Sequence, residues 1–158
     1  MPELAPVPEC YGFTIFCDDV RYEQGNKVSY IGTYRGLLRI QGTFPAALPK
    51  FVLVVRFNQN VEAYEPDLPV WIFLPGDDLE KPSIVGQLPN APDIGQPQGP
   101  IVSIEAHFAI SPFVIAMPGS ILVRVLRRGR LERLGSIKIE FVPPDAPVTV
   151  GDIVAAPT

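Results

Sequence analysis

Residues 13–44 read FTIFCDDVRYEQGNKVSYIGTYRGLLRIQGTF and lie within the longest stretch of the chain that contains no proline. Residues 13–18 alternate with the two-residue period of a β-strand, and both faces of that strand carry a bulky side chain. Residues 24–27, Gln-Gly-Asn-Lys, have the composition of a turn. Residues 28–34 and 36–41 are again typical of strands. The stretch therefore predicts two or three paired strands, which form before the first proline-marked corner.

Proline occupies 19 of the 158 positions, more than twice its usual share of about 5%. The prolines fall between apolar runs, where a fixed φ and a missing N–H end a strand or set a corner. No apolar stripe with the 3.6-residue period of a helix is longer than about two turns. The same reading predicts further strands at 50–58, 68–74, 101–110, 120–126 and 131–142, and the first of these is apolar enough to be buried on both faces.

This pattern predicts an all-β protein, a single-domain antiparallel β-sandwich of about eight or nine strands with immunoglobulin-like or C2-like layers. A β-barrel is the alternative. We expect an extended, proline-rich N-terminal arm over residues 1–12, the sandwich over 13–142 and an extended C-terminal arm over 143–158. The Pro/Gly-rich loop 86–100 is long for a compact domain, which indicates a role in function or assembly, or else disorder.

The composition restricts the class of protein. Hydrophobic residues make up 47% of the chain and charged residues 19%, which is typical of a folded domain. A net charge of −4 and a pI near 5.0 argue against general nucleic-acid binding, which needs a basic face. Residues 1–9 lack the basic and apolar regions of a signal peptide, and no apolar run is long enough to span a bilayer. We expect a cytoplasmic protein, or a virion component, with Cys10 and Cys17 as free thiols.

An acidic pair, Asp18 and Asp19, is the first candidate site. With Asp77 and Asp78 from a second loop it would give the converging oxygens that calcium requires. The alternative, which we favour, is that one acid of the pair binds Arg21 and accepts backbone N–H groups at a bend. A melting temperature that falls when chelator is added would support the calcium reading, and no change would exclude it.

His107 is the only histidine. No serine of the sequence has the context of a nucleophile elbow, so His107 has no nucleophile to activate. The alternation of its strand places His107 outward, with Ser103 and Glu105. We therefore interpret it as an exposed strand residue. One histidine and two poorly placed cysteines do not make a zinc site, and no glycine loop for phosphate precedes a helix. The sequence thus predicts no catalytic residue, no metal ligand and no cofactor, and the protein is not expected to be an enzyme.

Two further groups of residues have possible binding roles. Trp71 with Tyr64 and Phe73 would suit a carbohydrate platform, although a core tryptophan between two sheets is the commoner case. Five arginines cluster on the last predicted hairpin. They would suit an acidic partner or a phosphate backbone, or else they are a solvated tip whose charge prevents edge-to-edge pairing. The candidate partner-binding residues are Arg124, Arg127, Arg128, Arg130 and Arg133.

The first third of the chain also resembles a known family. The residues that carry the resemblance are Phe16-Cys17-Asp18-Asp19-Val20-Arg21, Glu23, Lys27-Val28-Ser29, Ile31-Gly32, Tyr34, Phe44-Pro45 and Leu48-Pro49-Lys50, with Pro118-Gly119 later. They are similar to the "CDDVR…GK.S.IG.Y…FP..LP" pattern of a family of bacterial and phage-associated proteins. The resemblance implies a small β-sandwich with no assigned activity, and it assigns no functional residue. The loop 86–100 and the proline-rich ends depart from the family pattern.

From these observations we expect a non-catalytic structural or interaction module, such as a phage virion accessory protein of the capsid or tail. It would engage protein neighbours through its arms, the long loop and the arginine hairpin, as a homo-oligomer or within a larger assembly, without membrane or nucleic acid. The alternative is a β-sandwich that binds a carbohydrate or calcium.

Overall fold

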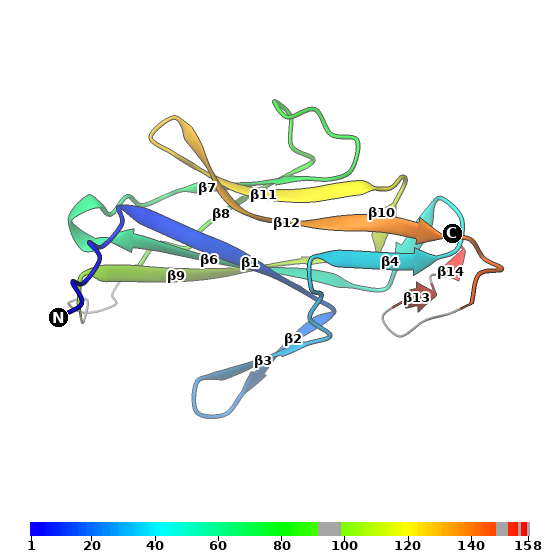
Figure 1. Ribbon diagram of the computed structural model, residues 1–158, viewed down its shortest axis with the longest axis horizontal. Helices are drawn as coiled ribbons and strands as arrows, with labels where there is room; N and C mark the ends of the chain where they lie inside the picture. The colour runs from blue at the N-terminus through cyan, green and yellow to red at the C-terminus, as the bar shows by residue number, and fades with distance from the viewer. Residues whose placement is uncertain (92–98, 148–151, 155, 158) are drawn as a thin grey trace.

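The protein is a two-layer β-sandwich, seen here in a computed structural model that describes residues 1–91, 99–147, 152–154 and 156–157 (Figure 1). Predictions for residues 92–98 of the long loop, and for 148–151, 155 and 158, lie outside the described residues. One layer is a three-stranded antiparallel sheet, in which the central strand β6 pairs with a neighbour on each side. Its strands are β1 (Cys10–Cys17), β6 (Phe51–Asn60) and β9 (Ile101–Ile110).

The second layer is a six-stranded sheet that faces the first. In spatial order its strands are β13 (Asp152–Val154), β4 (Leu37–Gln41), β12 (Arg130–Val142), β11 (Gly119–Arg127), β7 (Pro69–Phe73) and β8 (Ile84–Gln87). A small third sheet closes one end, and a hairpin extends from the three-stranded sheet. The third sheet consists of β10 (Phe113–Ile115), β5 (Ala46–Leu48) and β14 (Ala156–Pro157). The hairpin consists of β2 (Asp19–Glu23) and β3 (Lys27–Ile31).

The all-β class and the sandwich are confirmed, with two differences in detail. The described residues form fourteen strands, more than the eight or nine predicted, because strands of two or three residues have no periodic pattern to reveal them. The sheets are also not purely antiparallel, since β4 runs parallel to both β12 and β13. The helical content of the described part is one 3-10 turn, η1 (Val61–Ala63). No helix among those residues is long and apolar enough to cross a membrane.

The core lies between the two main sheets, and β6 is its central strand. The inward side chains of β6, including Phe51 and Phe57, are fully buried against Ile72 and Ile137 of the facing sheet. The outward side chains Val52 and Val54 are buried too, because the hairpin β2–β3 folds over that side of the sheet, where Val20 and Tyr30 pack against them. The prediction that this strand is buried on both faces is confirmed.

The sequence predicted two or three strands of the stretch 13–44 paired with one another, and this is confirmed only for the hairpin β2–β3. Strand β1 pairs with β6, β2 pairs with β3, and β4 pairs with β12 and β13. The turn at residues 24–27 is present, with positive φ at Gly25 and Asn26. Gly32 also has a positive φ of 65°, and a Cβ there would lie 2.1 Å from the Asp18 carboxylate. The positive φ at the turn favours Gly25 and Asn26, and the close approach of Asp18 leaves room only for glycine at position 32.

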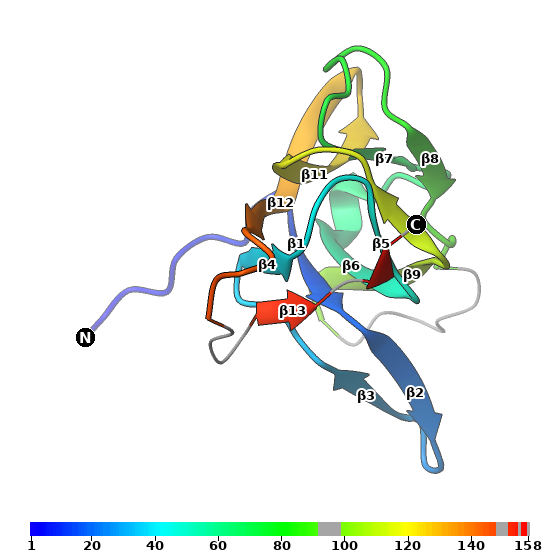
Figure 2. The ribbon, with the colours of Figure 1, turned by 90° about the vertical axis from the view of Figure 1, so that its right-hand side faces the viewer.

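The two ends of the chain differ. Residues 1–8 make no strand pairing and project away from the sandwich as an exposed arm (Figure 2). The N-terminal arm is shorter than the 12 residues expected, because β1 begins at Cys10. The C-terminal segment instead returns to the body, where β13 pairs with β4 and β14 pairs with β5. Of the two ends, as far as the structure describes them, only the N-terminal one projects as an exposed arm.

Candidate functional site

Five polar side chains meet on the outer face of the three-stranded sheet, and we call them the Glu105 cluster. Glu105 Oε1 accepts a hydrogen bond from the Tyr30 hydroxyl at 2.9 Å and lies 2.7 Å from His107 Nε2. Its Oε2 accepts from Arg56 Nη2 at 2.6 Å and from Arg56 Nε at 3.2 Å. With Nε2 donating to Glu105, His107 Nδ1 accepts from the Tyr22 hydroxyl. Glu105 therefore joins both strands of the hairpin to the sheet.

The positions of these residues follow from strand geometry. Successive side chains of a strand point to opposite faces, so Glu105 and His107 of β9 both point away from the core. Arg56 is the direct partner of Glu105 across the ladder between β6 and β9. Tyr22 and Tyr30 reach the same point from β2 and β3. The predicted outward direction of Glu105 and His107 is confirmed, but His107 is not exposed, because the hairpin leaves only 18% of its side chain accessible.

The electrostatics of the cluster favour its charged form. Burial raises the pKa of Glu105, but hydrogen bonds from His107, Arg56 and Tyr30 outweigh it, so the pKa of this carboxyl lies below its usual value. The hydrogen bond with Glu105 in turn raises the pKa of Arg56. Both ring nitrogens of His107 are occupied, so the imidazole has no free nitrogen for a metal or a substrate. The arrangement is suited to holding the hairpin rather than to proton transfer.

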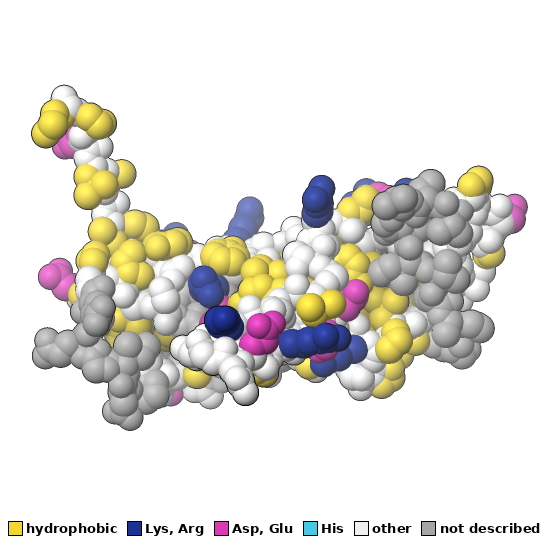
Figure 3. All heavy atoms as spheres, turned by 90° about the horizontal axis from the view of Figure 1, so that it is seen from below, with side chains coloured by type: hydrophobic (Ala, Val, Ile, Leu, Met, Phe, Trp, Pro, Cys, Tyr) yellow, Lys and Arg dark blue, Asp and Glu magenta, His cyan; other side chains and the backbone are white. Residues whose placement is uncertain are grey.

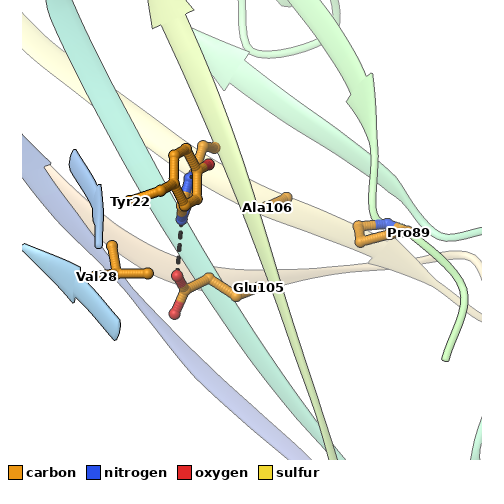
Figure 4. A pocket seen from close by; sticks show the side chains of 6 residues that line it. Tyr22, Val28, Pro89, Glu105 and Ala106 are labelled. Carbon is orange, nitrogen blue, oxygen red and sulfur yellow. Dashed lines mark hydrogen bonds and ion pairs between the residues drawn. The ribbon is translucent and has the colours of Figure 1, made fainter. Parts of the chain in front are cut away.

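A shallow hollow of about 500 Å³ lies beside this cluster. It opens between the hairpin and β9, and Tyr22 forms its rim with 74% of the residue exposed (Figure 4). The hollow is large enough for a side chain of another molecule and is partly polar. Its lining residues are Tyr22, Val28, Pro89, Glu105, Ala106 and His107.

We expect that Glu105→Gln lowers the free energy of unfolding at pH 7 by about 1–2 kcal/mol, because Arg56 loses its charged partner. A carboxyl whose pKa is lower in the folded state stabilises above its unfolded pKa and loses that effect as pH falls through the folded pKa. The deficit of the variant should therefore shrink between about pH 5 and pH 3. Urea unfolding across this range measures it, and the exposed Glu62→Gln should show no such trend.

The structure divides the five predicted arginines into two groups. Arg127, only 4% exposed, donates to Gln59 Oε1 at 3.1 Å, to Glu9 Oε1 at 2.7 Å and to the Ala63 carbonyl at 2.6 Å. Arg128 also binds Glu9, at 2.5 Å. These two arginines fix Glu9, where the projecting arm begins, and Arg127 is not the solvated tip residue that the sequence had suggested.

The other three arginines, Arg124, Arg130 and Arg133, are not part of this group. Arg130 is exposed at the turn between β11 and β12. Arg124 and Arg133 are direct partners across the ladder of the same two strands. A partner-binding role for these three stays a prediction. The sequence contained a signal for the division, since Ile121, Val123 and Val125 are buried and continued alternation places Arg127 on the same inner face.

Trp71 lies on the outer face of the six-stranded sheet, because its neighbours Val70 and Ile72 are both fully buried in the core. The interpretation of Trp71 as a core residue between the sheets is therefore wrong. It contacts Phe73 edge-on, with ring centroids 6.2 Å apart. Tyr64 does not join them, since its hydroxyl accepts from the Ala91 backbone N–H in the long loop, and its ring packs on the core.

The acidic residues considered as a calcium site are bound within the protein. Asp19 lies 2.5 Å from Lys50 Nζ and 3.8 Å from Arg21, and these cations together with a backbone N–H lower its pKa. Asp18 accepts from the Tyr34 hydroxyl. Asp77 accepts from two backbone N–H groups and one hydroxyl at its own turn. Within the described residues, no group of three or more metal-ligating side chains is present.

Both cysteines are free thiols at opposite ends of β1. Burial raises the pKa of each, which makes them poor nucleophiles.

No protein-family model, curated protein or solved structure matches the chain.

Proposed function

We propose that this protein is a non-catalytic interaction module that binds a protein partner, in the first place a second copy of itself, through its N-terminal arm. The observation that supports this most directly is the contrast between the root of the arm and the arm itself. Glu9 is fixed by two arginines, one of them buried, whereas Leu4 is 93% exposed. An apolar side chain presented to solvent from a fixed root is suited to binding another molecule.

The arm has the sequence of a polyproline II ligand. In residues 1–8, Pro2, Pro6 and Pro8 have a fixed φ, and each residue that precedes a proline is restricted to extended backbone. A polyproline II helix has three residues per turn. Met1, Leu4 and Val7 are spaced by three and therefore lie on one face, which makes an apolar ridge. Such helices bind with a low entropy cost because they are formed before binding.

The root gives the arm a defined direction. The Glu9 carbonyl accepts from the Asn60 N–H at 2.8 Å, and the hydrogen bond from Arg127 lowers the pKa of the Glu9 carboxyl. Nearby on β1, the half-exposed Tyr11 and Phe13 lie on the outer face, with the Arg56 guanidinium 5.9 Å from the Phe13 ring centroid. Figure 3, which looks at the molecule from the side of this face, shows the arm projecting sideways from the edge, with apolar side chains beside its root. Tyr, Phe and Arg are the residues enriched in protein interfaces.

The proposal predicts that deleting residues 1–8 abolishes self-association. The full chain should gain mass with rising concentration in light scattering after size-exclusion chromatography, and the shortened chain should stay monomeric. Leu4→Ser should weaken association at least tenfold, because it interrupts the apolar ridge. Ala5→Ser changes the next face of the same helix and serves as the matched control. Association that is indifferent to both the deletion and Leu4→Ser would refute the proposal.

We further infer that the setting of such an assembly is a virion, with the chain as an accessory protein of the capsid or tail. The sequence resemblance to phage-associated proteins supports this setting, and electron microscopy of particles carrying a labelled chain would test it. A ligand-binding sandwich is the second candidate, and the hollow of about 500 Å³ beside Tyr22 favours it. Perturbation of the Tyr22 and His107 resonances by a panel of simple sugars and by calcium would identify it.

A further inference from the structure

We propose that the arm of one copy docks on the outer face of the six-stranded sheet of a second copy, with Glu3 of the arm bound between Arg124 and Arg133. This inference rests on the proposed function and names the surface that receives the arm. The receiving surface, here called the arginine face, is defined by Trp71, Arg124, Arg133 and Ser136.

The arginine face carries an uncompensated pair of like charges. Arg124 of β11 and Arg133 of β12 are direct cross-strand partners, an arrangement that destabilises a sheet when both residues carry the same charge. Neither makes an ion pair with any residue that the structure describes, whereas Arg56, Arg127 and Lys138 all do. In a chain of net charge −4, two adjacent cations without an acid favour an external anionic group.

The arginine face is also hollowed beside the two arginines. The register of β11 and β12 shifts between Leu122 and Arg124, and a hollow of about 350 Å³ opens beside this irregularity. The hollow is lined by Leu122, Val123, Arg124, Arg133, Gly135 and Ser136. Two guanidinium groups can hold one carboxylate through several charge-assisted hydrogen bonds, and a serine hydroxyl can add another donor.

Trp71 borders the cationic pair on the same face. Trp71 is the cross-strand partner of Arg124 on the other side of β11, and the Arg124 guanidinium lies 5.3 Å from the Phe73 ring centroid. Val85 of β8, the partner of Trp71, is 62% exposed. Proline-rich segments bind grooves lined by aromatic side chains. Trp71 is partly exposed and provides such a side chain next to the cationic pair, whereas Phe73 is buried.

The arm complements this surface in both charge and polarity. Glu3 is an acidic residue of the arm beyond its fixed root, and the apolar Leu4 follows it. Eight residues of polyproline II span about 25 Å, so the arm can cover the distance between neighbouring strands of the sheet several times over. Because the arm projects away from its own sandwich (Figure 2), we assign the docking to a second copy.

The hollow beside the Glu105 cluster is the weaker alternative for the same arm. Its wall includes the carboxylate of Glu105, which keeps its negative charge because its pKa is lowered. Glu3 would meet a like charge there, and like charges placed together oppose association. The arginine face presents the opposite charge without a competing acid among its lining residues.

A charge-swap experiment on the full chain tests this docking. Glu3→Arg alone and the pair Arg124→Glu with Arg133→Glu should each lower the self-association constant at least tenfold in sedimentation velocity. The triple variant that combines them should recover association to within a few-fold of the native chain, because the attractive contacts are restored with reversed signs. The pair Arg35→Glu with Lys81→Glu, which changes net charge equally at exposed sites elsewhere, is the control.

The outcomes distinguish failure of the docking on the arginine face from failure of self-association through the arm. The docking on the arginine face is overturned if the triple variant associates no better than Glu3→Arg alone and no better than the pair Arg124→Glu with Arg133→Glu. If the arm deletion abolishes association but both reversals leave it unchanged, the arm binds elsewhere, and the proposed function stands without this inference. If the arm deletion changes nothing, both fail. Arg133→Ser, at an exposed position, gives the same comparison should the double reversal not fold.

Discussion

Replacing Phe51 by alanine should lower the free energy of unfolding by about 3–5 kcal/mol, as is usual for a fully buried phenylalanine. The ring of Phe51 lies in the middle of an aromatic group, with ring-centroid distances of 5.0 Å to Phe113, 5.7 Å to Tyr34 and 6.1 Å to Phe16. These neighbours come from β10, the segment after β3, and β1. The cavity would therefore weaken the junction of the main sandwich with the small third sheet.

Such a loss is a large part of the 5–15 kcal/mol that stabilises a typical domain. Urea unfolding followed by tryptophan fluorescence measures it, and Phe13→Ala is the matched control. Phe13 lies on the neighbouring strand β1 but points to the outer face and is 44% exposed, so its loss should cost less than about 1 kcal/mol. Equal losses for the two variants would contradict the placement of Phe51 at the centre of the core.

Arg127→Met should lower the free energy of unfolding by about 2–4 kcal/mol. The substitution keeps most of the apolar volume but removes the donor of the Ala63 carbonyl and one of the two donors of Gln59 Oε1, which still accepts from the Glu65 N–H at 3.0 Å. A buried polar group that loses its partner costs about 1–3 kcal/mol. The acceptors are Gln59 Oε1 and the Ala63 carbonyl, and Gln59 is fully buried. The variant also removes one of the two arginines that bind the Glu9 carboxylate, so self-association that depends on a fixed arm should weaken together with stability.

The neighbouring arginine provides the control for this prediction. Arg128 binds Glu9 and Glu65 at the surface, and its side chain is 53% exposed, where such pairs are worth about 0–1 kcal/mol. Arg128→Met should therefore change the urea midpoint only slightly. Two variants with the same small effect would show that Arg127 is not a buried structural residue.

The alternation of apolar residues in the sequence was sufficient to place most strands and their faces. It predicted β9 with its outward Glu105 and His107, and it predicted a central strand, β6, buried on both sides. It failed for Trp71 because the expectation followed residue type, although Val70 and Ile72 already indicated the outward direction. Arg127 was missed for the same reason. In both cases a local periodic signal was present and a general preference of the residue type outweighed it.

Strand pairing could not be read from the sequence in this way. The segment 13–44 contains four strands that belong to three sheets, since partners are chosen by burial of surfaces that lie far apart in the chain. The Glu105 cluster has the same origin, because Tyr22 and His107 are 85 positions apart and meet only when the hairpin folds over the sheet. The individual residues carry no local signal for that contact, and a candidate site built in this way becomes visible only in three dimensions.

The pairing of strand β4 restricts the order in which the protein can fold during its synthesis on the ribosome. Leu37–Gln41 is synthesised early, yet both of its ladder partners, β12 and β13, emerge about 100 residues later. Leu38 and Ile40 are fully buried in the folded protein. Until β12 and β13 are present, the sheet that buries these side chains cannot form, and both edges of β4 can pair with other chains. The second layer can therefore close only after β12 and β13 have been synthesised, and a nascent chain stalled before residue 130 would expose apolar surface that chaperones bind.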